Sequence, residues 1–275
     1  KYIIMNYKDI LEEKYNKYDE NSRLIKDKSH YVEYYIVSYF IRKYLKLGDK
    51  IADIGAGTGA YSIGLANLGF DICSVDLVSE NVKKLESKIT KDMKIKVFQG
   101  DAQDLSFLSE SDFNLTLCLG PLYHLFKIDE IKTTLLECSR ITKNDGYIFF
   151  SFKPSDALIY NWLMKKNCFE KRSFFMDNNY NPKNLPKENF SFWRIEDIIN
   201  MIHEIKSLQI VEMFSVNGLT MLFDNYVNSM SDEVFQDYLN YVKSSCTKPE
   251  LLGGSSQIVV ICKIDKEKIC DSKFF

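Results

Sequence analysis

The chain of 275 residues has a formal net charge of −2, with 45% hydrophobic and 27% charged residues, a balance typical of a globular protein with a sizeable core. Because this charge provides no overall positive field, it disfavours nucleic acid as a partner. The sequence has no secretory signal and no apolar stretch long enough to span a bilayer, so neither export nor membrane insertion is expected.

The cysteines and histidines favour neither disulfides nor a metal site. The seven cysteines are odd in number, widely spread and free of any C-x-x-C pair, unlike a disulfide framework or a zinc site. None of the three histidines has a cysteine or carboxylate nearby at ligand spacing. A reducing cytoplasm is therefore the expected compartment.

The first 46 residues form a predicted helical cap. Amphipathic patterns indicate helices over residues 6–18 and 29–46, the second with Ser29 as its N-cap. A charged connector lies between them. Met5 is a candidate for the native start.

Residues 47–153 alternate short apolar strands with helices. The predicted strands are 50–54, 70–76, 94–99, 113–119 and 147–152, and the predicted helices are 58–69, 78–89 and 128–142. This alternation is typical of an α/β fold in which helices cover both faces of a parallel sheet.

The alternation is then interrupted and resumed. Residues 154–192 are rich in aromatic, Asn and Lys residues and are too long for a plain connection, which predicts a lid insertion at the ligand edge of the sheet. The core continues over 193–264 with a helix at 194–206 and strands at 208–216 and 256–264. A helical insertion at about 218–252 separates these strands, and a polar tail covers 265–275.

The stretch DIGAGTGAYS at residues 53–62 follows the first strand directly. Gly55, Gly57 and Gly59 allow a sharp turn and a close approach of backbone to ligand. With Ala60, the loop also satisfies the relaxed dinucleotide pattern, and Asp76 lies 19 residues beyond Gly57, where a ribose-binding acid is expected. A dinucleotide, a nucleotide phosphate and S-adenosylmethionine (SAM) are all compatible with the loop alone.

Three acidic residues distinguish among these ligands. Asp53, at the end of the first strand, suits an ammonium group and would repel a pyrophosphate. Asp101 follows the third strand, at the edge where open parallel sheets bind ligands, and its carboxylate can accept from an adenine amine. With Asp76, these acids predict a cationic ligand that carries ribose and adenine, which describes SAM.

The segments Asp53–Gly59, Asp76 and Gly100–Ala102 resemble, in order and spacing, the successive motifs of the class I SAM-dependent methyltransferases. The resemblance implies a Rossmann-like, mostly parallel sheet of seven strands with the last strand reversed, plus SAM as cofactor and S-adenosylhomocysteine as product. It places the loop against the methionine part, Asp76 on the ribose and Asp101 near the adenine. The predicted cofactor-binding residues are Asp53, Gly55, Ala56, Gly57, Asp76, Leu77, Asp101, Ala102, Leu119 and Arg23.

Three further stretches, DENSRL, LGPLYHL and LLGGSSQIVVICK, resemble a bacterial group of small-molecule methyltransferases. The second of them follows the fourth strand, where methyltransferases of base amines or glutamine amides carry Asn-Pro-Pro-Tyr or a close variant. Leu119 stands at the polar first position of that motif. This departure disfavours nucleobase and amide methylation and favours O-, N- or C-methylation of a small molecule.

His124 and Tyr123 are the candidate catalytic residues. His124 titrates near neutral pH and is a candidate base or acceptor-orienting group, although packing against the following helix is an equal alternative. Tyr123 can face the sulfonium or the acceptor, or belong to the core. Arg23 can pair with the SAM carboxylate or with an acidic acceptor, and Tyr34 is a further candidate for lining the site; solvated or core positions are the alternatives.

Three other functions remain open at this point. A methyltransferase of RNA or protein would use a basic stripe, for which the only cluster is Lys165, Lys166, Lys171 and Arg172. A nicotinamide-dependent oxidoreductase would share the sheet, but Asp53 and Asp101 disfavour it. A non-catalytic SAM binder would share the entire cofactor site.

Overall fold

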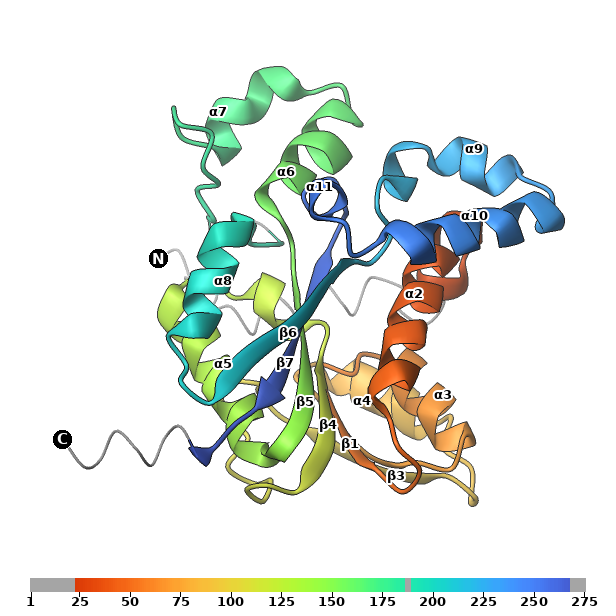
Figure 1. The fold of residues 1–275 in the computed structure, drawn as a ribbon, viewed down its shortest axis with the longest axis vertical. Coiled ribbons are helices and arrows are strands. Elements are labelled where there is room, and N and C mark those ends of the chain that lie inside the picture. The colour runs from red at the N-terminus through yellow and green to blue at the C-terminus, as the bar shows by residue number, and fades with distance from the viewer. Residues whose placement is uncertain (1–22, 186–188, 268–275) are drawn as a thin grey trace, which may run out of the picture.

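The computed structural model describes residues 23–185 and 189–267 (Figure 1). The predicted helix at 6–18, Met5 and most of the tail lie outside these ranges. Within them, no helix combines the length and the apolar character that crossing a bilayer requires.

A sheet of seven strands in the order β3-β2-β1-β4-β5-β7-β6 forms the centre of the molecule. The strands are β1 Lys50–Ile54, β2 Asp71–Asp76, β3 Lys94–Gln99, β4 Phe113–Cys118, β5 Thr142–Phe152, β6 Leu208–Ser215 and β7 Ile258–Ile264. The first five strands of this order pair in parallel, whereas β7 is antiparallel to both neighbours. The predicted Rossmann-like fold with a reversed last strand is therefore confirmed.

Helices cover both faces of the sheet, and each face has its own apolar core (Figure 1). On one face, α5 (Ile128–Ile141) and α8 (Ile195–His203) pack with Ile148 and Phe150; on the other, α2 (Lys28–Tyr44) and α3 (Ala60–Asn67) pack with Phe149. Successive side chains of a strand point to opposite faces, so the continuous apolar run of β5 serves both cores. The remaining core helix, α4 (Ser79–Glu86), packs against β2 and β3.

The start of α2 differs from the prediction. Its N-cap is Asp27, whose Oδ1 accepts from the backbone N–H of His30 at 3.0 Å. The same oxygen accepts from the Ser29 hydroxyl at 2.7 Å. Ser29 as N-cap is therefore wrong, because the charged residue two positions earlier takes that role.

The start of β5 also differs: the strand begins at Thr142, whereas the prediction placed it at residue 147. Its pairing with β4 shifts register between Phe113 and Leu115, and Asp145 adopts a positive φ of 61°. Residues 143 to 145 are polar, so a search for apolar runs does not detect this irregular first part of the strand.

The predicted insertion at 154–192 leaves the sheet at the end of β5 and rises above it (Figure 1). It contains α6 (Ser155–Ala157), the π-helix η3 (Leu158–Met164), the turn η4 (Phe169–Lys171) and α7 (Arg172–Phe175). Its two ends are joined, since the Trp193 N–H donates to the Lys153 carbonyl at 3.0 Å and the Ser155 N–H donates to the Trp193 carbonyl at 2.9 Å. The segment thus leaves the sheet at the carboxyl end of β5 and returns to the same place.

The second helical insertion separates β6 from β7 and packs beside α2 (Figure 1). It comprises η5 (Thr220–Leu222), α9 (Asp224–Ser229), α10 (Asp232–Ser245) and α11 (Pro249–Leu252). Phe235 and Leu239 of α10 belong to the same core as α2. This insertion therefore extends the core on that face.

The stacked pair Phe40 and Phe214 joins α2 to β6, with ring centroids 3.9 Å apart and an interplanar angle of 9°. We expect Phe40→Ala to lower the free energy of unfolding by about 3 to 5 kcal/mol, because the fully buried ring leaves a cavity. Denaturant unfolding checks this value. Tyr226→Ala is the control, since Tyr226 is 66% exposed and its loss should change stability by less than about 0.5 kcal/mol. Equal effects of the two substitutions would contradict this account of α2.

Candidate functional site

The glycine loop turns sharply between β1 and α3. Gly55, Gly57 and Gly59 all have positive φ, at 75°, 56° and 85°, a conformation that residues with a Cβ rarely adopt. At Gly55 a Cβ would also lie 2.5 Å from Cδ of Pro121. The loop backbone therefore stays bare where it borders a cavity that the ends of β1, β2, β3 and β4 surround.

Asp53 lies at the end of β1 with 2% of its surface exposed. Its Oδ2 accepts from the Ser62 hydroxyl of α3 at 2.6 Å. Burial raises the pKa of Asp53 to about 6, and the nearby charge of Asp76 adds to the rise. The ionised carboxylate is thus held at an energetic cost that a bound cation would offset.

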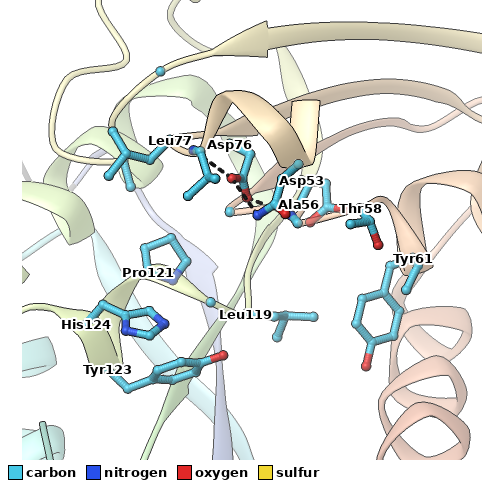
Figure 2. A pocket seen from close by; sticks show the side chains of 18 of the residues that line it. Asp53, Ala56, Thr58, Tyr61, Asp76, Leu77, Leu119, Pro121, Tyr123 and His124 are labelled. Atoms are coloured by element: carbon cyan, nitrogen blue, oxygen red, sulfur yellow. Dashed lines mark hydrogen bonds between the residues drawn. The ribbon is translucent and has the colours of Figure 1, made fainter. Parts of the chain in front are cut away.

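Asp76 ends β2 and is also buried. Its Oδ2 accepts from the Gly57 N–H at 2.7 Å, and its Oδ1 accepts from the Val78 N–H at 2.9 Å and from the Asn81 amide at 3.1 Å (Figure 2). Burial raises the pKa of Asp76, while these hydrogen bonds oppose the rise. Three donors therefore fix the carboxylate, and its remaining lone pairs can accept from ligand hydroxyls.

The cavity collects the whole predicted cofactor set. The residues of that set which line it are Arg23, Asp53, Gly55, Ala56, Gly57, Asp76, Leu77, Asp101, Ala102 and Leu119. Asp101 follows β3, and its Oδ1 accepts from the Gln103 N–H at 3.0 Å. Their shared position at the carboxyl ends of parallel strands is where such sheets bind ligands.

Tyr123 and His124 line the same cavity from the 3₁₀ turn η2 (Pro121–His124), across from Asp76 and Leu77 (Figure 2). The Nδ1 of His124 lies 2.9 Å from the Asn189 carbonyl oxygen. A carbonyl only accepts, so Nδ1 carries the proton, and the neutral ring has its lone pair on Nε2. Phe190 packs on both rings, at 5.7 Å from Tyr123 and 5.3 Å from His124.

Arg23 enters from the N-terminal side, on the turn η1 (Arg23–Ile25). Its Nη1 lies 3.2 Å from Oε1 of Glu33 on α2. This ion pair anchors the guanidinium at the cavity. Arg23 therefore lies at the cavity that contains the other predicted cofactor residues. Its pairing with the SAM carboxylate or with an acidic acceptor stays a prediction.

Sequence reasoning missed several lining residues, among them Thr58, Tyr61 and Asn81. Asn81 lies on α4, and the sequence gives no sign that it belongs to the site. Only the hydrogen bond from its amide to Asp76, which the structure shows, connects it with the cavity. Tyr61 is partly buried and stacks on the ring of Tyr34, with centroids 5.6 Å apart. Tyr34 is not among the described residues that line the cavity, and it supports Tyr61 from behind.

A second cavity of about 470 Å³ lies beside the first, within the range of roughly 300 to 1,000 Å³ that small-molecule sites occupy. Most of its lining comes from the insertion, and Ser256 and Gln257 contribute from the segment that enters β7. Arg23 and Tyr123 line both cavities. The two spaces are thus neighbours that meet at these two side chains.

The first cavity fits SAM on its own chemistry. The bare glycine backbone admits close contact with a ligand, and Asp53 is a buried acid suited to an ammonium group. In the described part of the chain, no lysine or arginine pairs with Asp53 or Asp76. A pyrophosphate beside the loop would therefore meet the uncompensated carboxylate of Asp53, whereas an ammonium would be stabilised by it, and Asp76 can accept from ribose hydroxyls.

Comparison with known proteins supports the same conclusion. Residues 51–146 match the model of a methyltransferase domain family. Along almost its entire length, the fold matches magnesium protoporphyrin IX methyltransferase from Synechocystis, solved with bound SAM: TM-score 0.56, 12% identity, 96% of this chain and 100% of that one. The chain therefore contains a class I SAM-dependent methyltransferase domain over residues 51–146.

Two further methyltransferases are similar to this chain over different shares of their length. Glycine/sarcosine N-methyltransferase from Aphanothece halophytica is 27% identical over 58% of this chain and 69% of its own length. Phosphoethanolamine N-methyltransferase 1 from Haemonchus contortus gives a TM-score of 0.60 at 16% identity, covering 94% of this chain and 48% of that one. Three other curated relatives are matched over only 22% to 44% of their length.

We expect the substitution Asp53→Asn to have opposite effects on the stability of the protein and on its affinity for SAM. A carboxyl whose pKa is raised in the folded state loses stability as the pH rises from 3.8 through about 6. At about pH 8, the ligand-free variant should therefore be more stable than the wild type, by roughly 3 kcal/mol. Below about pH 4 the gain should vanish. Its affinity for SAM should fall at least tenfold, or about 1.4 kcal/mol.

Denaturant unfolding at the two pH values and calorimetric titration with SAM measure these effects. Asp71→Asn is the matched control, since Asp71 lies exposed at the other end of β2 and should change neither quantity. Loss of stability in Asp53→Asn at the higher pH, together with unchanged SAM affinity, would contradict the assigned role.

Proposed function

We propose that this methyltransferase transfers the methyl group of SAM to a small-molecule acceptor bound in the second cavity. The observation that carries the proposal is that Arg23 and Tyr123 line both cavities. An acceptor held by the insertion would then lie next to the cofactor. The same observation supports the insertion at 154–192 as the lid of the acceptor site.

When bound, SAM supplies a methyl carbon already activated by its sulfonium. The acceptor atom forms its new bond to this carbon with its own lone pair, so alignment and exclusion of water are the main tasks left to the chain. The apolar rings of Tyr123, Trp162 and Phe190 wall the acceptor side. They exclude water and fix the acceptor in line with the methyl group.

His124 is the candidate group for the proton that an oxygen or nitrogen acceptor gives up. Its Nδ1 is held by the Asn189 carbonyl, which leaves Nε2 as the basic nitrogen of the neutral ring. Tyr123 and Phe190 pack beside it. His124 lines the first cavity next to Tyr123, which lines both cavities, and this position supports the proposed role.

The alternatives from the sequence are less well supported. The family match sets aside the nicotinamide-dependent oxidoreductase. For an RNA or protein acceptor, the candidate basic cluster does not form a free stripe: Lys165 pairs with Asp224 at 2.6 Å, and Arg172 lies 4.7 Å from the ring of Tyr180. A soluble, cytoplasmic enzyme that acts on a small molecule remains the proposal.

The test uses methyl-labelled SAM and a cell extract separated by ultrafiltration. After chromatography of the low-molecular-weight filtrate has separated the unreacted SAM, we expect label in a new small compound. Phe190→Ala should reduce this incorporation at least tenfold, about 1.4 kcal/mol, without weakening S-adenosylhomocysteine binding. Phe169→Ala is the matched control, because Phe169 lies exposed on the same insertion and should leave transfer unchanged. Label confined to retained RNA or protein would refute the small-molecule assignment.

A further inference from the structure

The described lining of the second cavity carries basic side chains and no acidic ones. Its charged residues are Arg23, Lys153 and Lys166, and none of the other described residues that line it is an aspartate or glutamate. These three cations come from separate segments: the turn before α2, the end of β5 and the end of the π-helix region. Arg23 is paired with Glu33, so Lys153 and Lys166 are the cations of the lining whose charge bears most on a ligand, a local feature that the chain's overall charge of −2 hides.

Lys153 lies where the two cavities meet. Its Nζ lies 5.0 Å from the ring centre of Tyr123 and 4.5 Å from that of Phe190. The Ser256 carbonyl accepts from it at 3.5 Å. These contacts hold the ammonium on the acceptor side of Tyr123, where it can bind an anionic group next to the transfer position.

Lys165 and Lys166 are sequence neighbours with different surroundings. Lys165 donates to Asp224 at 2.6 Å and to the Met221 carbonyl. Lys166 lies 4.6 Å from the ring centre of Trp162 and lines the second cavity. Lys165 therefore has its hydrogen-bond partners outside the cavity, whereas Lys166 lines the cavity.

Asn161 adds a polar feature to the same cavity. Its amide nitrogen donates to the Gly254 carbonyl at 3.3 Å, which orients the side chain. The opposite atom, Oδ1, is buried and has no hydrogen-bond partner in the described structure. A buried acceptor atom without a partner is rare, and an N–H or O–H of a bound molecule would satisfy it.

The three stretches that suggested a narrower bacterial group come together here. Arg23 begins the described part of DENSRL, Tyr123 belongs to LGPLYHL, and Ser256 and Gln257 belong to LLGGSSQ. The antiparallel pairing of β5 with β7 brings the last stretch next to Lys153. Segments far apart in the sequence thus build one cavity.

We propose that the acceptor is an anionic small molecule: an apolar body that carries a carboxylate or phosphate for Lys153 and Lys166, and a hydroxyl or amino group that donates to Asn161. This inference rests on the proposed function, because it assigns the acceptor class of the same cavity. The anion and the donor group together would fix the orientation of the acceptor toward Tyr123.

The test measures binding of four simple probes to the protein saturated with S-adenosylhomocysteine, by ligand-observed NMR titration. The probes are benzoate, phenyl phosphate, neutral benzamide and cationic benzylamine. We expect both anions to bind at least tenfold more tightly than benzamide, about 1.4 kcal/mol, and benzylamine to bind most weakly. The ratio between benzoate and phenyl phosphate then tells which anion the site prefers.

Lys153→Met retains the side-chain stem and removes the charge, so it should weaken both anions at least fivefold, roughly 1 kcal/mol, and leave benzamide unchanged. Lys165→Met is the control and should bind all four probes like the wild type. Unchanged S-adenosylhomocysteine affinity shows that both variants are folded.

Two results would overturn the inference in different ways. Binding of benzamide or benzylamine as tight as that of the anions, or anion binding that Lys153→Met leaves unchanged, refutes the anionic class and retains a small-molecule cavity. Failure of all four probes to bind the cofactor-loaded protein refutes the proposed acceptor cavity as well.

Discussion

Two buried carboxylates at the ends of neighbouring strands are the constraint on which the site depends. Asp53 and Asp76 lie beside a loop whose glycines leave the backbone bare, and burial raises the pKa of both side chains. Backbone N–H groups and small polar side chains partly satisfy them. The ligand-free protein thus bears an electrostatic cost that an ammonium at Asp53 and ribose hydroxyls at Asp76 would relieve. The order of the sheet makes this arrangement, since β1 and β2 pair in parallel and end at the same edge.

The second cavity is formed in a different way from the first. The sheet fixes the predicted cofactor residues, whereas the second cavity, where we propose that the acceptor binds, is lined mostly by the insertion at 154–192, whose two ends are joined by hydrogen bonds at Lys153 and Trp193. This separation allows the insertion to change the acceptor class while the cofactor loop stays the same. Tyr123 and Arg23 are the only parts of the described chain that belong to both cavities. They are therefore the natural determinants of the distance between acceptor and methyl group.

The sequence predicted the sheet well, because its strands follow from local patterns. Apolar runs located the strands, and the spacing of Asp53, Asp76 and Asp101 placed three acids at one edge, where the structure brings them to one cavity. The predictions that failed depend on details of local geometry, such as Asp27 in place of Ser29 as the cap of α2 and the irregular start of β5 at Thr142. The acceptor cavity could not be predicted, because Arg23, Asn161 and Gln257 meet only through tertiary packing of segments with no common periodicity. The composition of the insertion indicated aromatic walls, and its cations could not be assigned to the inside or the outside until Lys165 and Lys166 were placed.

The central claim is that Asp76 and the glycine loop hold the adenosyl cofactor. Calorimetric titration of S-adenosylhomocysteine into the wild type and into Asp76→Ala tests it most directly, since the product binds without turnover and needs no acceptor. The account predicts micromolar binding to the wild type and at least tenfold weaker binding to the variant, about 1.4 kcal/mol. Absence of binding to the wild type, or equal affinity in the variant, would contradict it.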